Sequence, residues 1–173
     1  SEQSKIVQGI AAESGGSNFE WTTNTEERNR LWQARHDAAY ACKALVPNGE
    51  IWATDVCVPI SQLAECIRET QVDIRESKLI APIVGHVGDG NFHLVLLVDK
   101  GNAEEVQRAH ALHERMVMRA LAMGGTCTGE HGIGYGKLDF LIAEHGEAVN
   151  VMRSIKQALD PNNIMNPGKV LRV

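Results

Sequence analysis

The sequence contains no apolar run of the roughly 18 residues that a membrane-spanning helix requires, so we expect no transmembrane segment. It also lacks internal repeats and blocks of like charge, and its net charge of −5 argues against nucleic acid as a partner. The first residues, SEQSKIVQGI, include neither an initiator Met nor a signal or transit segment. We interpret the chain as a fragment of a longer protein.

Phosphate-binding motifs are also missing. The segment GIGYGK is similar to part of a Walker loop, but His131 stands where that loop needs its first Gly and Leu138 stands where it needs Ser or Thr. No GxGxxG follows an expected strand, so a Rossmann dinucleotide site has no support. These absences argue against a P-loop NTPase and against a nicotinamide-dependent dehydrogenase of the Rossmann type.

Cysteine is scarce and shows no pairing pattern. The four cysteines, at positions 42, 57, 66 and 127, form no CxxC motif and no zinc-finger spacing. The chain is too large and too poor in cysteine for a disulfide-stapled secreted domain, so reduced and mostly buried thiols are expected. Cys127 lies near the suspected site, where a small buried apolar residue is favoured over a nucleophile.

The order of expected elements favours an α+β fold. Strands are expected at residues 19–23, 51–58, 78–87 and 91–99, which are rich in β-branched and aromatic residues, and VPNGE at 46–50 is expected to turn the chain. The last two of these strands are consecutive and close. We therefore predict an antiparallel sheet with helices packed on one face, followed by a C-terminal helical segment.

Three of the expected helices carry apolar residues at helical spacing. One begins near Glu26 with Thr23 or Asn24 as its N-cap, and its predicted buried stripe is Leu31, Ala34, Ala38, Cys42 and Leu45. Another begins at Ser61 with Leu63, Ile67, Thr70 and Ile74 on one face, and a third covers 102–122 with Val106, Ala109, Leu112, Met116 and Ala120 aligned. His110 and His113 lie beside this last stripe, where we favour a solvated flank over a metal site. Two more helices follow residues 124–136, and the last ends at Asp160 because Pro161 cannot continue it.

Two histidines surround a glycine-rich turn in GHVGDGNFHL. His86 and His93 are seven residues apart and would point to opposite faces of one continuous strand. A tight turn at Gly88-Asp89-Gly90 would reset this alternation and let both imidazoles converge. With a carboxylate they would form a plausible site for a divalent metal, and Glu130, between Gly129 and His131 in TGEHGIG, is the natural third ligand. The alternative is that both histidines are structural and that Asp89 is only an exposed turn residue.

Arg35 lies at the margin of the expected stripe of its helix, about 40° from Leu31 on the helical wheel. An arginine in this position can present its guanidinium to a carboxylate. By pattern alone, however, a surface arginine lying along the core edge is the more common case.

Three motifs in order now indicate a family. The segments PIVGHVGDGNFHLVLLVD, GGTCTGEHGIGYGK and LDPNNIMNPGKVL together resemble the C-terminal part of FAD-linked oxidases of the vanillyl-alcohol-oxidase type. The resemblance covers nearly the whole chain and is strongest to the D-lactate dehydrogenase branch, with D-2-hydroxyglutarate dehydrogenase and the D subunit of glycolate oxidase as relatives. It implies that residues 1–123 are the latter part of a ferredoxin-like cap or substrate domain. Residues 124–173 would then pack on an N-terminal FAD domain absent from this chain.

The resemblance also implies roles for individual residues. Metal-dependent members use two histidines and a glutamate at positions matching His86, His93 and Glu130, with Zn or Mn as the expected metal. The histidine matching His131 lies beside the substrate hydroxyl and would be the general base, and the arginine matching Arg35 binds the substrate carboxylate. FAD, held mainly by the missing domain, would accept the hydride, and cytochrome c or another acceptor would take the electrons.

Two departures from the family pattern bear on the substrate. The 2-hydroxyglutarate enzymes carry Lys where this chain has Ala53 and Asn where it has Val95. Without these polar groups little would hold a second carboxylate, which favours a short D-2-hydroxy acid such as D-lactate. The alternatives are the glycolate or 2-hydroxyglutarate branch and a non-catalytic interaction module, since some relatives are described as actin-interacting. A mitochondrial location is implied if the source is eukaryotic, and a cytoplasmic one otherwise.

Overall fold

The computed structural model describes residues 2–46 and 49–173, so positions 47 and 48 of the expected turn lie outside the described residues. The chain divides into two units, Ser1–Ala41 and Cys42–Val173. Helix α1 (Glu2–Glu13), which the sequence did not lead us to expect, and most of α2 (Thr25–Ala44) belong to the first unit. The boundary predicted near residue 123 concerns packing against a separate FAD domain and stays a prediction.

Helix α2 begins where the capping residues predicted. The side-chain oxygen of Asn24 accepts hydrogen bonds from the backbone N–H groups of Glu26 at 2.8 Å and Glu27 at 3.1 Å. The predicted buried stripe is wrong, because no residue of α2 is buried and Leu31 is 39% exposed. Helical periodicity identifies the apolar face of a helix, but it does not supply the surface that would cover that face.

The strand expected at 19–23 is also wrong, since these residues have no regular secondary structure. Alternating aromatic and β-branched residues favour an extended backbone, but a strand forms only when its backbone pairs with a neighbour. Here the Thr22 hydroxyl instead accepts a hydrogen bond from the backbone N–H of Asn24, in the turn that precedes α2.

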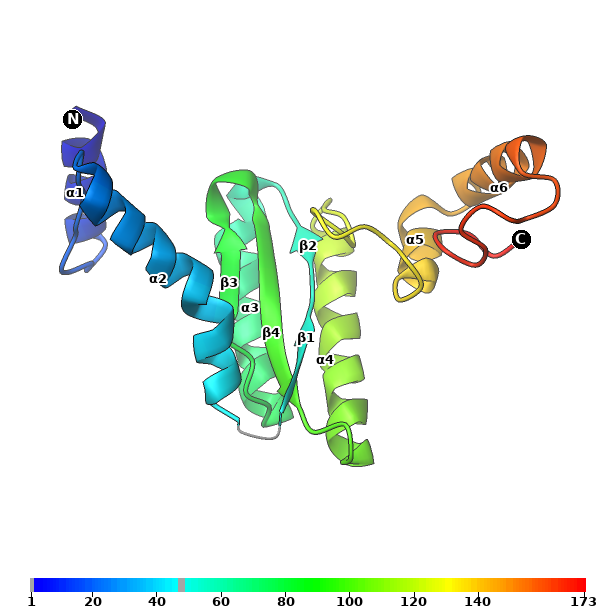
Figure 1. Ribbon diagram of the computed structural model, residues 1–173, viewed down its shortest axis with the longest axis horizontal. Helices are drawn as coiled ribbons and strands as arrows, with labels where there is room; N and C mark the ends of the chain where they lie inside the picture. Colours follow the sequence, from blue (N-terminus) through cyan, green and yellow to red (C-terminus); the bar gives the residue numbers. More distant parts are fainter. Residues whose placement is uncertain (1, 47–48) are drawn as a thin grey trace. The chain divides into compact units, whose positions relative to one another are not determined.

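The second unit is built on an antiparallel sheet whose central strand is β4 (Asn91–Val98). β1 (Glu50–Ala53) and β2 (Val56–Cys57) follow one another along one edge of β4, and β3 (Ile83–His86) pairs with the other edge (Figure 1). Every residue of β4 is buried, in keeping with its near-continuous apolar sequence.

Helices α3 (Ile60–Ser77) and α4 (Ala103–Ala122) cover one face of this sheet (Figure 1). The core between them and the sheet contains Phe92, Leu94, Leu96 and Val98 from β4, with Leu63 and Cys66 from α3 and Leu112 and Met116 from α4. Because side chains alternate along a strand, His93, Val95 and Leu97 point to the opposite face of the sheet. The structure thus confirms the predicted α+β class with helices on one face.

The segment expected as one strand over 51–58 is interrupted at Thr54 and Asp55. Thr54 still bonds to β4, because its backbone N–H donates to the Leu94 carbonyl at 3.0 Å and its hydroxyl accepts from the Leu94 N–H at 2.8 Å. Asp55 lies beyond this contact, and both residues are 1% exposed. A buried carboxylate needs hydrogen-bond donors, which a continuous strand would not bring to this position.

Residues 124–136 form a glycine-rich loop. Helices α5 (Leu138–His145) and α6 (Ala148–Leu159) follow this loop, and α6 ends before Pro161 as predicted. The C-terminal tail then returns to the glycine-rich loop, where the Val170 N–H donates to the Gly134 carbonyl at 2.8 Å. Within the described residues, none of the helices has the length and apolar character needed to cross a bilayer.

His113 on α4 is buried, so the solvated flank predicted for it is wrong, while His110 is exposed as expected. The His113 ring packs edge-on against the rings of Trp52 and Phe140, with ring centroids 5.4 Å and 5.3 Å apart. Phe140 comes from α5, and the periodicity of α4 could not show that a later helix would cover this flank. Burial lowers the pKa of His113 to about 4, and its Nε2 has no hydrogen-bond partner among the described residues.

The pKa of His113 predicts a pH-dependent stability. An unfolded histidine titrates near pH 6.5, so between about pH 6.5 and pH 4 the unfolded chain binds more protons than the folded one. The free energy of unfolding should therefore be fully retained above pH 6.5 and fall by up to about 3 kcal/mol as the pH drops through this window. Denaturant unfolding at a series of pH values should show a shallower fall for His113→Gln, with the exposed His110→Gln as control. An unchanged pH slope in His113→Gln would contradict the assignment.

Candidate metal and substrate site

The turn between β3 and β4 brings the two histidines of GHVGDGNFHL together. Val87–Asp89 form a short 3-10 helix, and Gly90 follows with φ +78°, a conformation that glycine adopts at little cost. The hairpin pairs His86 with Asn91 and Val84 with His93, so both imidazoles lie on the face of the sheet away from α3 and α4. Their ring centroids are 6.2 Å apart. The predicted resetting of the alternation at this turn is confirmed.

His93 is held in one orientation by a backbone carbonyl. Its Nδ1 lies 2.9 Å from the Thr54 oxygen, so Nδ1 carries the hydrogen and the lone pair of the neutral ring is on Nε2. That Nε2 lies 3.0 Å from Glu130 Oε1, which presents a lone pair of its own. Two acceptors at this distance repel each other unless a proton or a cation lies between them. The contact is therefore one that a shared proton or a bound cation would stabilise.

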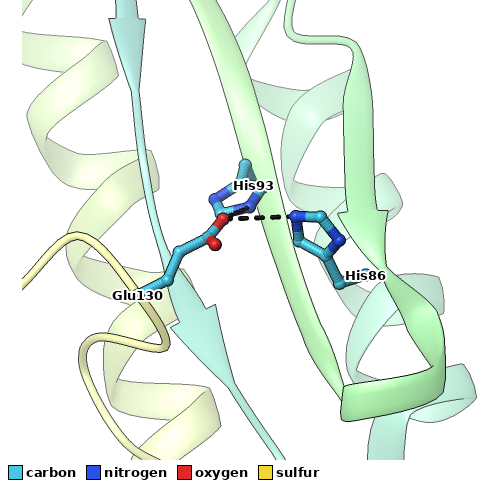
Figure 2. A group of neighbouring side chains, drawn as sticks. All are labelled: His86, His93 and Glu130. Atoms are coloured by element: carbon cyan, nitrogen blue, oxygen red, sulfur yellow. Dashed lines mark ion pairs between the residues drawn. The ribbon is translucent and has the colours of Figure 1, made fainter. Parts of the chain in front are cut away.

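Glu130 completes the cluster from the glycine-rich loop (Figure 2). Its Oε1 is 3.0 Å from His93 Nε2 and 3.4 Å from His86 Nε2. One ligand atom from each of these three residues lies within 4.8 Å of the other two, a separation that one metal ion can bridge. Two neutral imidazoles and a carboxylate are a donor set used for Zn²⁺ and other divalent transition metals with open positions. His86, His93 and Glu130 therefore fit the divalent metal that the family resemblance implies.

His131 lies next to this cluster. Its ring centroid is 5.2 Å from that of His93, its Nε2 is 3.7 Å from Glu130 Oε1, and its side chain is 55% exposed. His131 also lines a cavity of about 550 Å³ together with Trp52, His113, Ile133 and Phe140. The imidazole thus lies between the His86–His93–Glu130 cluster and an accessible hollow, where it could reach a small molecule.

Asp55 fastens the glycine-rich loop to the sheet. Its Oδ2 accepts hydrogen bonds from the backbone N–H groups of Glu130 at 3.1 Å and His131 at 3.0 Å, and from the Thr128 hydroxyl at 2.7 Å, while its Oδ1 accepts from Asn91 Nδ2 at 2.7 Å. Burial alone would raise the pKa of this carboxyl, but the hydrogen bonds from Thr128, His131, Asn91 and Glu130 outweigh it and hold the pKa well below its usual range. Asp55 is therefore a carboxylate at neutral pH.

Asp55 was not among the residues that the sequence motifs indicated. The available signal was its place in IWATDVCV, where an acidic residue interrupts a run otherwise typical of a buried strand. Such a residue is rarely buried without dedicated donors. Its partners come from residues 36 to 82 positions away, so the sequence alone could not name them.

Two more charged residues hold the same loop. Lys137 Nζ donates to the Asp55 backbone oxygen at 3.0 Å and lies 3.4 Å from Asp55 Oδ2. At the start of the loop, Glu144 accepts from the Cys127 N–H at 2.9 Å. Cys127 is fully buried, and burial followed by its contact with Glu144 raises the pKa of its thiol to about 12, so the thiol stays protonated.

Arg35 lies on α2, in the unit formed by Ser1–Ala41. Its guanidinium carbon is 5.5 Å from the centroid of the Trp32 ring, a distance at which a cation and an aromatic face attract each other. Its role in binding a substrate carboxylate stays a prediction.

The chain matches the family described as FAD linked oxidases, C-terminal domain, over residues 1–170. It therefore belongs to this family, and the resemblance inferred from the three motifs is confirmed. Membership associates the chain with FAD as the family's cofactor.

Its curated relatives include D-lactate dehydrogenases. The chain is 52% identical over 99% of its length to the probable D-lactate dehydrogenase, mitochondrial, of Danio rerio, and covers 35% of that protein. It is 46% identical over 98% of its length to the mitochondrial D-lactate dehydrogenase [cytochrome] of Arabidopsis thaliana, covering 30%. A glycolate oxidase subunit of Bacillus subtilis is 30% identical over 95% of the chain, with 35% covered. The chain thus spans about a third of the length of these relatives.

A solved structure shares the fold. The 4-ethylphenol oxidase from Gulosibacter chungangensis, in complex with isoeugenol, matches with a TM-score of 0.59 and 17% identity, over 86% of this chain and 31% of that chain. At this identity the likeness shows the fold alone.

The packing of the loop predicts the effect of filling Gly129. A Cβ at this position would clash with Asn91 Nδ2 and lie 3.2 Å from Asp55 Oδ1, so Gly129→Ala should push the loop away from the sheet. We expect a loss of about 1–3 kcal/mol in the free energy of unfolding. Gly136→Ala is the matched control, because a Cβ there meets nothing within 4 Å. Denaturant unfolding compares the two variants, and equal stability would contradict this account of the loop.

Proposed function

We propose that the chain is the C-terminal substrate- and metal-binding part of an FAD-dependent D-2-hydroxy-acid dehydrogenase that oxidises D-lactate to the 2-keto acid. The observation that carries the proposal is the meeting of His86, His93 and Glu130 with His131 beside them. A chain of the FAD-linked oxidase family with such a cluster has the groups needed to bind and deprotonate a hydroxy acid. The names of the relatives in Danio rerio and Arabidopsis thaliana support D-lactate as the substrate.

The FAD domain would lie in the two thirds of the relatives' length that this chain does not cover. In this proposal residues 1–123 are the latter part of the cap domain and 124–173 pack on the FAD domain. Large apolar side chains in the C-terminal segment support such packing, since Ile155 is 55% exposed and Leu159 and Ile164 are each 76% exposed. An apolar surface of this kind favours a protein partner.

The residues beside His93 favour a small substrate. Val95 lies two positions further along β4, on the same face as His93, and pairs with Ala53 of β1. Neither side chain has a hydrogen-bonding group that could hold a second carboxylate. This is consistent with a short monocarboxylate and disfavours the 2-hydroxyglutarate branch.

His86, His93 and Glu130 would hold the divalent cation, Zn²⁺ or Mn²⁺. When bound, such a cation acts as a Lewis acid that lowers the pKa of a hydroxyl it contacts. His131 would take the proton of the substrate hydroxyl, since the free lone pair of an imidazole nitrogen can accept a proton. Arg35 would bind the substrate carboxylate and orient the C2–H bond, which contributes positioning to the reaction.

FAD, held mainly by a domain outside this chain, would supply the hydride-accepting chemistry of the reaction, while His131 would hold the hydroxyl proton. A cytochrome, for example cytochrome c, is the proposed electron acceptor, because relatives in Arabidopsis thaliana and Saccharomyces cerevisiae carry the word cytochrome in their names. The same relatives are named mitochondrial, so we propose a mitochondrial location. Among the described residues no observation favours the actin-interacting alternative.

The metal assignment predicts a change in metal content. In the intact flavoprotein, His93→Ala should reduce the bound divalent metal to background, because it removes a buried donor already oriented by the Thr54 carbonyl. Elemental analysis of purified protein measures this, with His110→Ala on α4 as the control that keeps its metal. Wild-type metal content in His93→Ala would rule out the cluster as the binding site.

The general-base assignment predicts a kinetic effect. His131→Ala in the intact flavoprotein should slow flavin reduction by D-lactate by about 10²–10⁴-fold, since it removes the imidazole proposed to take the hydroxyl proton. Stopped-flow absorbance of the flavin measures the rate, and His145→Ala is the matched control. A rate within about tenfold of wild type, below the range expected for a general base, would remove His131 from this role.

A further inference from the structure

The orientation of the candidate site depends on two adjacent residues in the break between β1 and β2. The Thr54 carbonyl fixes the ring of His93 from one side, at 2.9 Å from Nδ1. Asp55, the next residue, accepts the backbone N–H groups of Glu130 and His131 through a single oxygen, Oδ2. Thr54 and Asp55, which lie outside the regular strands, therefore contact three of the four residues in the site, namely His93, Glu130 and His131.

The Asp55 carboxylate is rigidly held by its neighbours. It is 1% exposed, and its two oxygens accept from Asn91 on β4, from Thr128 and from two loop N–H groups. Lys137, whose side chain is 11% exposed, lies 3.4 Å from Oδ2 and supplies the opposite charge that a buried carboxylate needs. The first and last residues of the segment 128–137 thus both contact the Asp55 side chain.

Asp55 does not itself belong to the cluster that would bind the cation. Its Oδ2 is directed to the backbone of the loop, and its Oδ1 is shared between Asn91 at 2.7 Å and the Nδ1 side of His93 at 3.6 Å. The Nε2 of His93, which faces Glu130, is on the other side of the ring. Asp55 therefore acts on the site through its hydrogen bonds to the loop backbone and through its proximity to His93, and not as a ligand.

We propose that Asp55 is the positioning residue of the site, holding the backbone of Glu130 and His131 so that the metal-ligand carboxylate and the general base are both presented to the histidines of the β3–β4 hairpin. This inference rests on the proposed function. The side chains of Glu130 and His131 are half exposed, so packing restrains them little, and the fixed backbone sets how far each can reach. Ligand groups must be placed to within about 0.5 Å to act together, which a freely moving glycine-rich loop does not provide.

The test is Asp55→Asn in the intact flavoprotein. Asparagine keeps the size of the side chain but replaces one acceptor oxygen with an NH₂ donor, so some of the five donors around the carboxylate, Lys137 Nζ included, lose their acceptor. We expect the Kd for Mn²⁺, and in a parallel series for Zn²⁺, to rise about 10–100-fold at unchanged FAD content, as is typical for residues that orient metal ligands. Hydrogen exchange of the Glu130 and His131 amides should become faster in the same variant.

Asp160→Asn is the matched control. Asp160 is also a buried carboxylate that accepts two backbone N–H groups, from Ile164 and Met165, and pairs with a lysine, Lys156. Its loss should alter stability without changing metal affinity. Thr128→Ser, which keeps the hydroxyl that donates to Asp55, should bind metal as wild type does, and Thr128→Val should fall between wild type and Asp55→Asn.

The outcomes separate this inference from the proposed function. Weaker metal binding together with faster loop exchange in Asp55→Asn supports the positioning role. Faster exchange with metal affinity within about threefold of the wild type would show a purely structural carboxylate, and unchanged exchange would show that the loop does not depend on it; either result overturns the inference while the metal site stands. If the wild-type protein binds neither Mn²⁺ nor Zn²⁺, the proposed metal function fails and the positioning role fails with it.

Discussion

The site depends on one buried carboxylate between two segments that are far apart in the sequence. Asp55 interrupts the edge of the sheet and collects N–H and O–H donors from the glycine-rich loop more than 70 positions later. Without such an acceptor these backbone N–H groups would have to find other partners, and an unpaired buried donor or acceptor costs about 1–3 kcal/mol. At the break between β1 and β2, Asp55 is not part of a strand and instead accepts hydrogen bonds from the loop. These bonds hold Glu130 and His131 near His86 and His93.

The two faces of β4 have different roles. Phe92, Leu94 and Leu96 point toward α3 and α4 and form the core. His93 and Val95, which alternate with them, point to the opposite face, where the hairpin delivers His86. A strand buried along its whole length makes a rigid support, and rigid support is what a metal and substrate site requires.

The features predicted correctly were those with local causes. The hairpin at Gly90, the helical stripe of α4 and the end of α6 before Pro161 follow from backbone preferences and periodicity within a few residues. Three of the errors were cases in which a distant segment decides. Residues 19–23 have strand composition but form no pairing, Leu31 has the right spacing but is not buried, and His113 is covered by Phe140 from a later helix.

Short, continuous motifs were enough to infer the family, the order of helices and strands, and the candidate residues His86, His93, Glu130 and His131. The fold was needed to show that ligand atoms of His86, His93 and Glu130 lie within 4.8 Å of one another and that Asp55 holds the loop in place. The physical reason is that hydrogen bonding of a buried carboxylate is satisfied by whichever donors the fold brings near. No pattern in the neighbourhood of Asp55 specifies a backbone amide 75 positions away.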